Sequence, residues 1–209
     1  MLKYGRHKGI KTMKLNYPKG ATPLNPDETT GLIPSYVNTQ SELNELEGRN
    51  IEDAVEWIFR RKKTNILNVS FVLELHKRMF NQVWKWAGFP RNSEKNIGVL
   101  KEQINSRLHQ LLKNVEFWIK KNTYPWDEIG ARFHHGLVSI HVFPNGNGRH
   151  ARLMTDILLE TNGQKPFSWG RKKTSDPIEI EGPIRKAYID ALKHADSGKL
   201  EPLLEFVRS

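Results

Sequence analysis

The chain has 209 residues, carries a formal net charge of +10 and contains no cysteine. A chain of this length is expected to form one domain around a single sizeable core. The lack of cysteine excludes disulfides, thiolate metal sites and a cysteine nucleophile, and it fits a reducing compartment such as the cytoplasm. No apolar run reaches the length of a membrane span and no secretory signal is recognisable, so we expect a cytoplasmic protein with no membrane partner.

The first 38 residues are predicted to form a basic, largely irregular arm. Residues 1–19 carry six lysine or arginine side chains and no acidic one, and the proline-rich residues 18–34 favour an extended or irregular chain. The positive charge suggests an acidic partner, with nucleic acid as the first candidate. We keep direct nucleic-acid binding as an alternative and favour a solvated tail, because most charge runs are solvated.

Residues 39–209 are predicted to form a single, mostly α-helical domain. A capping box of Thr39 and Glu42 opens a helix over residues 39–62, and apolar residues at helical spacing predict the helices that follow. These cover residues 68–86, 101–121, 125–141 and 147 to about 163, with two shorter helices in the C-terminal segment 183–209. The polar residues 91–99, RNSEKNIGV, are rich in turn formers and indicate a small β-hairpin flap.

The helix over residues 39–62 has a carboxylate in an unusual place. At 100° per residue its apolar side chains form one stripe, and Glu47 falls near the middle of that stripe. A carboxylate that faces a core is costly unless a cation pairs with it, and Arg149 or Arg152 could supply that cation. The alternative is that Glu47 extends to solvent near the start of the helix.

The sequence HVFPNGNGRHAR, residues 141–152, gathers polar groups in a stretch of chain without acidic residues. Gly146 and Gly148 allow positive φ, so that neighbouring backbone N–H groups can converge on an anion. A helix that begins near residue 147 adds the positive end of its dipole. Arg149 and Arg152 lie three residues apart, and both can reach one polyanion. The sequence therefore predicts a phosphate-binding site.

His141 stands at the start of this stretch, where a neutral imidazole can act as a general base for a hydroxyl group. Each feature alone has a simpler explanation: a hydrogen-bonding histidine, an ordinary glycine turn, or solvated helix arginines. Their combination in this order favours function. A metal site of His134, His135 and His141 is the main rival, but adjacent helix residues point about 100° apart, and no carboxylate is near in sequence.

Residues 141–152 resemble the signature of the Fic family, whose pattern is His-x-Phe-x-acid-Gly-Asn-Gly-Arg-x-x-Arg. The resemblance extends over about residues 39–200 and includes Trp86-Ala87-Gly88 ahead of the flap. Within the family the chain is most similar to the branch called mobile mystery protein B. That branch is associated with a helix-turn-helix protein, so the resemblance implies such a protein as a partner.

The resemblance implies a Fic-type helical bundle that transfers AMP from ATP to a Tyr, Thr or Ser hydroxyl of a target protein. ATP is then the co-substrate, and Mg²⁺ is the expected cofactor. His141 corresponds to the catalytic base, and the flap corresponds to a docking site that pairs with a target segment. The residues implied to hold phosphates are Gly146, Asn147, Gly148, Arg149 and Arg152, and the implied docking residues are Asn96, Ile97, Gly98 and Val99.

Residues at two positions could change the activity that the resemblance implies. Asn145 stands where the family has an acid that binds magnesium, and an amide brings no charge, so the phosphates would mainly hold the metal. Glu47-Gly48 resembles the end of the family's inhibitory segment, Ser/Thr-x-x-x-Glu-Gly/Asn, although Leu43 occupies the Ser/Thr position. In that segment the glutamate pairs with the last arginine of the signature, which is Arg152 here, and keeps ATP from seating productively. The helix over residues 39–62 is thereby implied to be inhibitory.

The leading hypothesis is a self-inhibited protein adenylyltransferase. Removal of AMP from a protein, or transfer of another phosphate-containing group, are alternatives that use the same site. A nucleotide- or nucleic-acid-binding regulator without catalytic activity is the alternative from another class, and steep salt dependence of DNA binding would support it.

Overall fold

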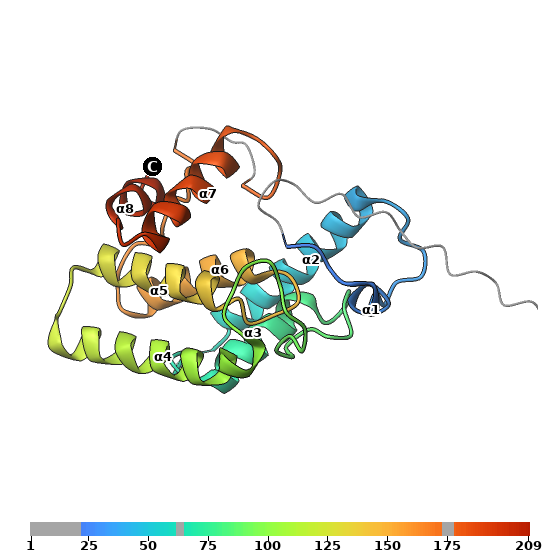
Figure 1. Cartoon of the computed structure of the whole chain (residues 1–209), viewed down its shortest axis with the longest axis horizontal. Coiled ribbons are helices and arrows are strands. Elements are labelled where there is room, and N and C mark those ends of the chain that lie inside the picture. Colours follow the sequence, from blue (N-terminus) through green and yellow to red (C-terminus); the bar gives the residue numbers. More distant parts are fainter. Residues whose placement is uncertain (1–21, 62–64, 173–177) are drawn as a thin grey trace, which may run out of the picture.

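The computed structural model describes residues 22–61, 65–172 and 178–209 (Figure 1). Within these ranges every regular element is a helix, and the β pairing is limited to one bridge between Leu32 and Trp84. The helices are α1 Pro26–Thr29, α2 Gln40–Phe59, α3 Val69–Phe80, the 3-10 turn η1 Lys101–Gln103, α4 Ile104–Lys121, α5 Trp126–Ile140, α6 Asn147–Thr161, α7 Pro183–Asp196 and α8 Glu201–Val207. The predicted mostly α-helical fold is confirmed.

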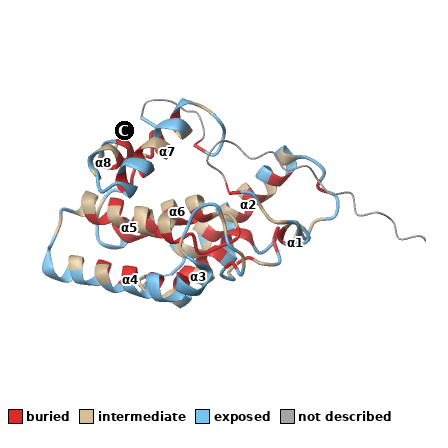
Figure 2. Ribbon diagram, in the orientation of Figure 1, coloured by how far each residue is buried: buried red, intermediate tan, exposed pale blue. Residues whose placement is uncertain are grey.

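Helices α5 and α6 pack along each other at the middle of the molecule, and the other helices surround them (Figure 1). One buried cluster lies around α3, α5 and α6, where Figure 2 shows the buried faces turned inward, and includes Phe80, Phe133 and Met154. A second cluster, with Tyr188 and Phe206, joins α7 and α8 to α5. The junction between α5 and α6 is therefore supported from two sides. None of the helices in the described ranges is long and apolar enough to cross a membrane.

The helix boundaries follow the sequence signals at most ends. Thr39 caps α2 as predicted, because its hydroxyl accepts a hydrogen bond from the Glu42 N–H at 3.2 Å while the Glu42 carboxylate accepts from the Thr39 N–H at 3.0 Å. Helix α3 ends at Phe80 rather than at residue 86. The Trp84 N–H bonds back to the Phe80 carbonyl at 2.8 Å, and Trp84 then pairs with Leu32. The apolar periodicity of the sequence continues beyond Phe80, but the helix ends there because the following residues pair with the N-terminal segment.

The arm predicted over residues 1–38 is described only from Thr22 onward, and its basic residues 1–19 lie outside the described residues. Residues 22–38 contain the short helix α1, and Glu28 and Val37 are buried. Glu28 forms an ion pair with Lys95 at 2.5 Å and accepts a hydrogen bond from the Ser93 hydroxyl at 2.9 Å. This part of the chain therefore packs against residues 91–99.

The prediction of a β-hairpin at residues 91–99 is wrong, because this segment contains no strand. Buried Arg91 explains the difference. Its guanidinium donates to the carbonyls of His141 at 2.7 Å, Ser93 at 2.8 Å and Val99. One side chain thereby satisfies carbonyl groups that a partner strand would otherwise bond. Residues 91–99, called the flap loop below, cross the end of α5 as irregular chain.

Four buried histidines are expected to make the fold less stable in mild acid. Burial lowers the pKa of His76, and it lowers the pKa to about 3 for His134 and to about 4 for His141 and His150. Between pH ~6.5 and ~4 these histidines are protonated in the unfolded chain but neutral in the folded protein. The free energy of unfolding therefore falls as the pH falls. Burial raises the pKa of the Asp156 carboxyl to about 6, so this group stabilises the fold as the pH falls. The four histidines outweigh this single carboxyl.

Thermal unfolding followed at a series of pH values checks this expectation. The melting temperature should be constant above pH ~6.5 and fall below it. A melting temperature that is independent of pH between ~7 and ~5 would contradict the burial of neutral histidines.

Candidate active site

The segment of residues 141–152, called the signature segment below, joins α5 to α6. His141 ends α5 in the left-handed conformation, with φ 55° and ψ 62°. Phe143 is fully buried, and Asn147 ties the turn together: its amide oxygen accepts from the Phe143 N–H at 2.9 Å and its amide nitrogen donates to the Phe143 carbonyl at 2.7 Å. The Asn147 side chain, which the resemblance assigns to phosphate binding, is therefore occupied in shaping the turn.

His76 on α3 packs against the same turn and bonds to it. Its Nδ1 accepts from the Gly88 N–H at 3.0 Å, so Nε2 carries the proton and donates to the Asn145 carbonyl at 3.0 Å. The ring also stacks on Phe143 with centroids 3.6 Å apart. Gly146 has φ 78°, and a Cβ there would lie 2.6 Å from the Phe80 ring, so glycine is required. His76 gave no signal in the sequence, because its partners are distant along the chain.

His141 is buried, and its imidazole makes no hydrogen bond with the described residues. Its side chain lines a cavity of about 910 Å³. Burial, with the positive charge of nearby Arg91, lowers the pKa of His141 to about 4. The imidazole is therefore neutral at physiological pH, which is the form that a general base requires.

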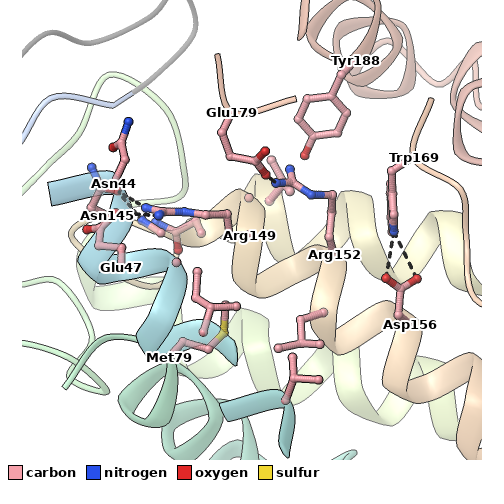
Figure 3. Close-up of a pocket in the computed structure, with 18 of the residues that line it drawn as sticks. Asn44, Glu47, Met79, Asn145, Arg149, Arg152, Asp156, Trp169, Glu179 and Tyr188 are labelled. Carbon is pink, nitrogen blue, oxygen red and sulfur yellow. Dashed lines mark hydrogen bonds and ion pairs between the residues drawn. The ribbon is translucent and has the colours of Figure 1, made fainter. Parts of the chain in front are cut away.

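The N-terminus of α6 opens into the same cavity. Gly146 is the N-cap, and no side chain caps the helix, so the first backbone N–H groups are available to an anion. Gly146, Gly148, Arg149 and Arg152 all line the cavity together with His141. In Figure 3 both arginines extend from α6 toward the same side of the helix. The structure thus places His141 in one cavity with the residues that the sequence predicted to bind phosphate.

Glu47 is buried and paired, as the sequence required of a carboxylate in an apolar stripe. One oxygen lies 2.5 Å from Arg149 Nη1, and the other accepts the Trp84 indole N–H at 2.6 Å (Figure 3). The cation is therefore Arg149, the first arginine of the signature, and not Arg152 as the resemblance implied. Trp84 was not anticipated as a partner, because it lies in the turn that the sequence predicted to be helical.

Arg152 has a different acidic partner. It forms an ion pair with Glu179, from the segment before α7, and its guanidinium lies 5.6 Å from the Tyr188 ring centroid (Figure 3). The Tyr188 hydroxyl lies 3.0 Å from His134 Nε2. Both arginines of the signature are therefore neutralised by carboxylates from outside the signature segment. Glu179 gave no signal in the sequence.

Asn145 is engaged on both sides of its amide. The oxygen accepts from the Gly146 N–H at 2.6 Å and lies 3.5 Å from Arg149 Nη2, while the nitrogen donates to the Thr22 carbonyl at 3.3 Å. A metal ion at the amide oxygen would have to displace donors already bound to it. The predicted metal role of Asn145 is therefore weak in this arrangement.

The flap residues lie beside His141. A Cβ on Gly98 would come within 2.6 Å of the His141 Cβ, so the backbone passes directly over the histidine. Ile97 lines the cavity and is exposed, Asn96 is exposed, and the Val99 N–H donates to the Ile140 carbonyl at 3.4 Å. The flap loop thus borders the site as predicted, although it is not a hairpin.

The rival interpretation, a histidine metal site, finds no support in the geometry. His134 bonds Tyr188, while His135 lies 2.8 Å from Asp196 at the surface. Among the described residues no three His, Cys, Asp or Glu side chains are grouped as metal ligands.

Comparison with known proteins agrees with the signature. The sequence model of the Fic/DOC family matches residues 66–159. The chain is 28% identical over 149 residues, or 69% of its length, to a protein named protein adenylyltransferase Fic from Aedes aegypti, and it spans only 28% of that relative's length.

Two solved structures share the fold. Fic-1 from Caenorhabditis elegans matches with a TM-score of 0.64 and 22% identity, covering 86% of this chain and 51% of that one. The BepC protein of Bartonella tribocorum, solved with bound AMPPNP, matches with a TM-score of 0.64 and 18% identity, covering 95% and 96% of the two chains. Residues 66–159 therefore match the Fic/DOC family, and the described fold is similar to that of solved Fic domains.

Proposed function

We propose that the protein is an adenylyltransferase that moves AMP from ATP to a Ser, Thr or Tyr hydroxyl of a target protein. The observation that carries the proposal is the placement of neutral His141 in one cavity with the uncapped N-terminus of α6 and two arginines. The Fic-named relatives and the AMPPNP-bound neighbour support ATP as the nucleotide.

In the proposed reaction the target hydroxyl attacks the α-phosphorus of ATP and gives its proton to His141. The bond to the oxygen that bridges the α- and β-phosphates breaks, and pyrophosphate leaves. Backbone N–H groups at the start of α6 stabilise charge on the α-phosphate, and Arg149 and Arg152 bind the outer phosphates. The flap loop, with Ile97 at its exposed edge, receives the target segment.

We further propose that α2 inhibits this activity through Glu47. A carboxylate at 2.5 Å occupies the guanidinium face of Arg149 that a phosphate would use. Since Glu47 is also held by the Trp84 indole, its geometry is fixed. Removal of AMP by the same site remains the second candidate for this glutamate, because a buried carboxylate near a phosphate site can orient a water molecule.

Magnesium is proposed as the metal, bound mainly by the phosphates. Asn145→Asp is expected to lower the magnesium concentration for half-maximal transfer several-fold, because a carboxylate adds the charge that the amide lacks. The rate of AMP transfer measured across a magnesium titration in a Glu47→Gly background checks this expectation. An unchanged or higher magnesium requirement would contradict a metal site beside residue 145.

Mass spectrometry of a lysate treated with ATP and the Glu47→Gly protein tests the proposal. Proteins that carry an AMP adduct on a hydroxyl side chain should be found, and a Glu47→Gly/His141→Ala protein should produce none. Phosphate adducts in place of AMP adducts would overturn the assignment. If a helix-turn-helix protein is the partner, as the resemblance implies, it should be among the modified or co-purifying proteins.

The regulator without catalytic activity predicts no adduct at all, with ATP or DNA binding retained. Its binding to DNA should weaken steeply with salt.

A further inference from the structure

Arg152 is neutralised by a carboxylate that comes from neither the signature segment nor α2. Glu179 lies in the segment before α7, and its Oε1 forms an ion pair with Arg152 Nη2. Both side chains line the cavity to which His141 also contributes, and Figure 3 shows the carboxylate in contact with the guanidinium. A phosphate that enters the cavity therefore meets an Arg152 side chain that already has an anionic partner.

The fold fixes the position of Glu179 from both sides. Ile178 is buried in the cluster that joins α7 and α8 to α5, and its carbonyl accepts a hydrogen bond from Arg185 Nη1 at 3.2 Å. Helix α7 begins at Pro183, and its residue Ile184 is buried in the same cluster. The short span between these anchors holds Glu179 at the edge of the cavity.

The cavity has two walls, and each wall supplies one carboxylate to α6. Helix α2 brings Glu47 to Arg149, and the segment before α7 brings Glu179 to Arg152. In the described ranges α2 and α7 do not pack on each other. The two ion pairs share no residue, so we expect the effects of breaking them to combine.

The two carboxylates differ in how readily a phosphate can displace them. The Glu47 side chain is 6% exposed and is also held by the Trp84 indole, so its release would leave a buried charge without its cation. The Glu179 side chain is 43% exposed, and water can solvate it as soon as it leaves Arg152. Displacement of Glu179 therefore requires only that a side chain at the surface turns away.

We propose that Glu179 is a displaceable competitor for the outer phosphates of the nucleotide. This inference rests on the proposed adenylyltransferase function, in which Arg152 binds those phosphates. In the free protein Glu179 occupies the Arg152 guanidinium, and ATP displaces it. AMP has no outer phosphate and leaves the ion pair intact. Glu179 therefore lowers the affinity of the site for ATP and not its affinity for AMP.

Isothermal titration calorimetry of the purified full-length protein with ATP and with AMP tests this inference. Glu179→Gln should tighten ATP binding about two- to five-fold, the range expected for loss of a partly exposed ion pair, and leave AMP binding unchanged. The same gain is expected in the Glu47→Gly background. Glu181→Gln is the matched control, because Glu181 is exposed, belongs to the same segment and does not line the cavity.

A double-mutant cycle shows whether the gain comes from Arg152. In an Arg152→Gln protein, Glu179→Gln should leave the dissociation constant of ATP unchanged, because the cation for which carboxylate and phosphate compete is absent. A gain of the same size without Arg152 would mean that Glu179 acts only through the general charge of the cavity, which would overturn the inference.

Equal ATP affinities of the wild-type and Glu179→Gln proteins, an equal gain for AMP, or an equal gain from Glu181→Gln would each overturn it as well. In these cases ATP still binds, and the proposed function stands. Failure of all these proteins to bind ATP would overturn the proposed function together with the inference.

Discussion

Glu47→Gly should raise the rate of AMP transfer about ten-fold or more. The substitution frees the Arg149 guanidinium, which now pairs with Glu47 at 2.5 Å, and a charge-assisted bond to a phosphate is worth about 1.5–3 kcal/mol. The rate of label transfer from α-labelled ATP to lysate proteins gives the comparison with the wild-type chain. A lower melting temperature is also expected, because glycine inside a helix costs about 1 kcal/mol and the Trp84 indole loses its acceptor.

Glu45→Gly is the matched control for that experiment. Glu45 lies on the same helix, is exposed, and pairs with Arg49 at the surface. This variant carries the same helix penalty and leaves Arg149 paired, so its transfer rate should equal that of the wild type. Equal rates for both variants, with a folded Glu47→Gly protein, would show that Glu47 does not restrain the reaction.

His141→Ala should lower AMP transfer by about 10²–10⁴-fold, the usual contribution of a general base. ATP binding should persist, because the imidazole makes no hydrogen bond with the described residues and the phosphate-binding groups lie on α6. Single-turnover transfer and equilibrium ATP binding, both in the Glu47→Gly background, separate the two effects.

His135→Ala controls for loss of a histidine from the same helix. Its ring contacts Asp196 and Ser139 rather than the cavity, so transfer should continue at the rate of the background protein. If the His141→Ala protein transferred AMP at an undiminished rate, the imidazole would have no catalytic role.

The sequence predicted the helices well where local signals decide. The capping box at Thr39 acts within a few residues, and α2 begins directly after it. The end of α3 was missed because pairing between Trp84 and Leu32 depends on chain distant in sequence. The flap hairpin was missed for a similar reason, since the buried Arg91 guanidinium replaces the cross-strand hydrogen bonds.

The sequence predicted which residues of the signature segment lie at the site, but not which side chains form ion pairs with them. The signature segment itself contains His141, the glycine turn and both arginines, so its spacing indicated them as candidates. Glu47 stood out because a carboxylate in an apolar stripe demands a partner. Its choice of Arg149, the pairing of Arg152 with Glu179, and the placement of Thr22 beside Asn145 arise from tertiary packing, which periodicity does not encode.

The most direct test of AMP transfer compares ATP labelled on the α-phosphate with ATP labelled on the γ-phosphate. Glu47→Gly protein, magnesium and a lysate are used, with Glu47→Gly/His141→Ala protein as the control. Label is expected on protein from the α position alone, and only when His141 is present. Label from the γ position alone would mean a kinase, and no transfer from either position despite ATP binding would contradict an adenylyltransferase.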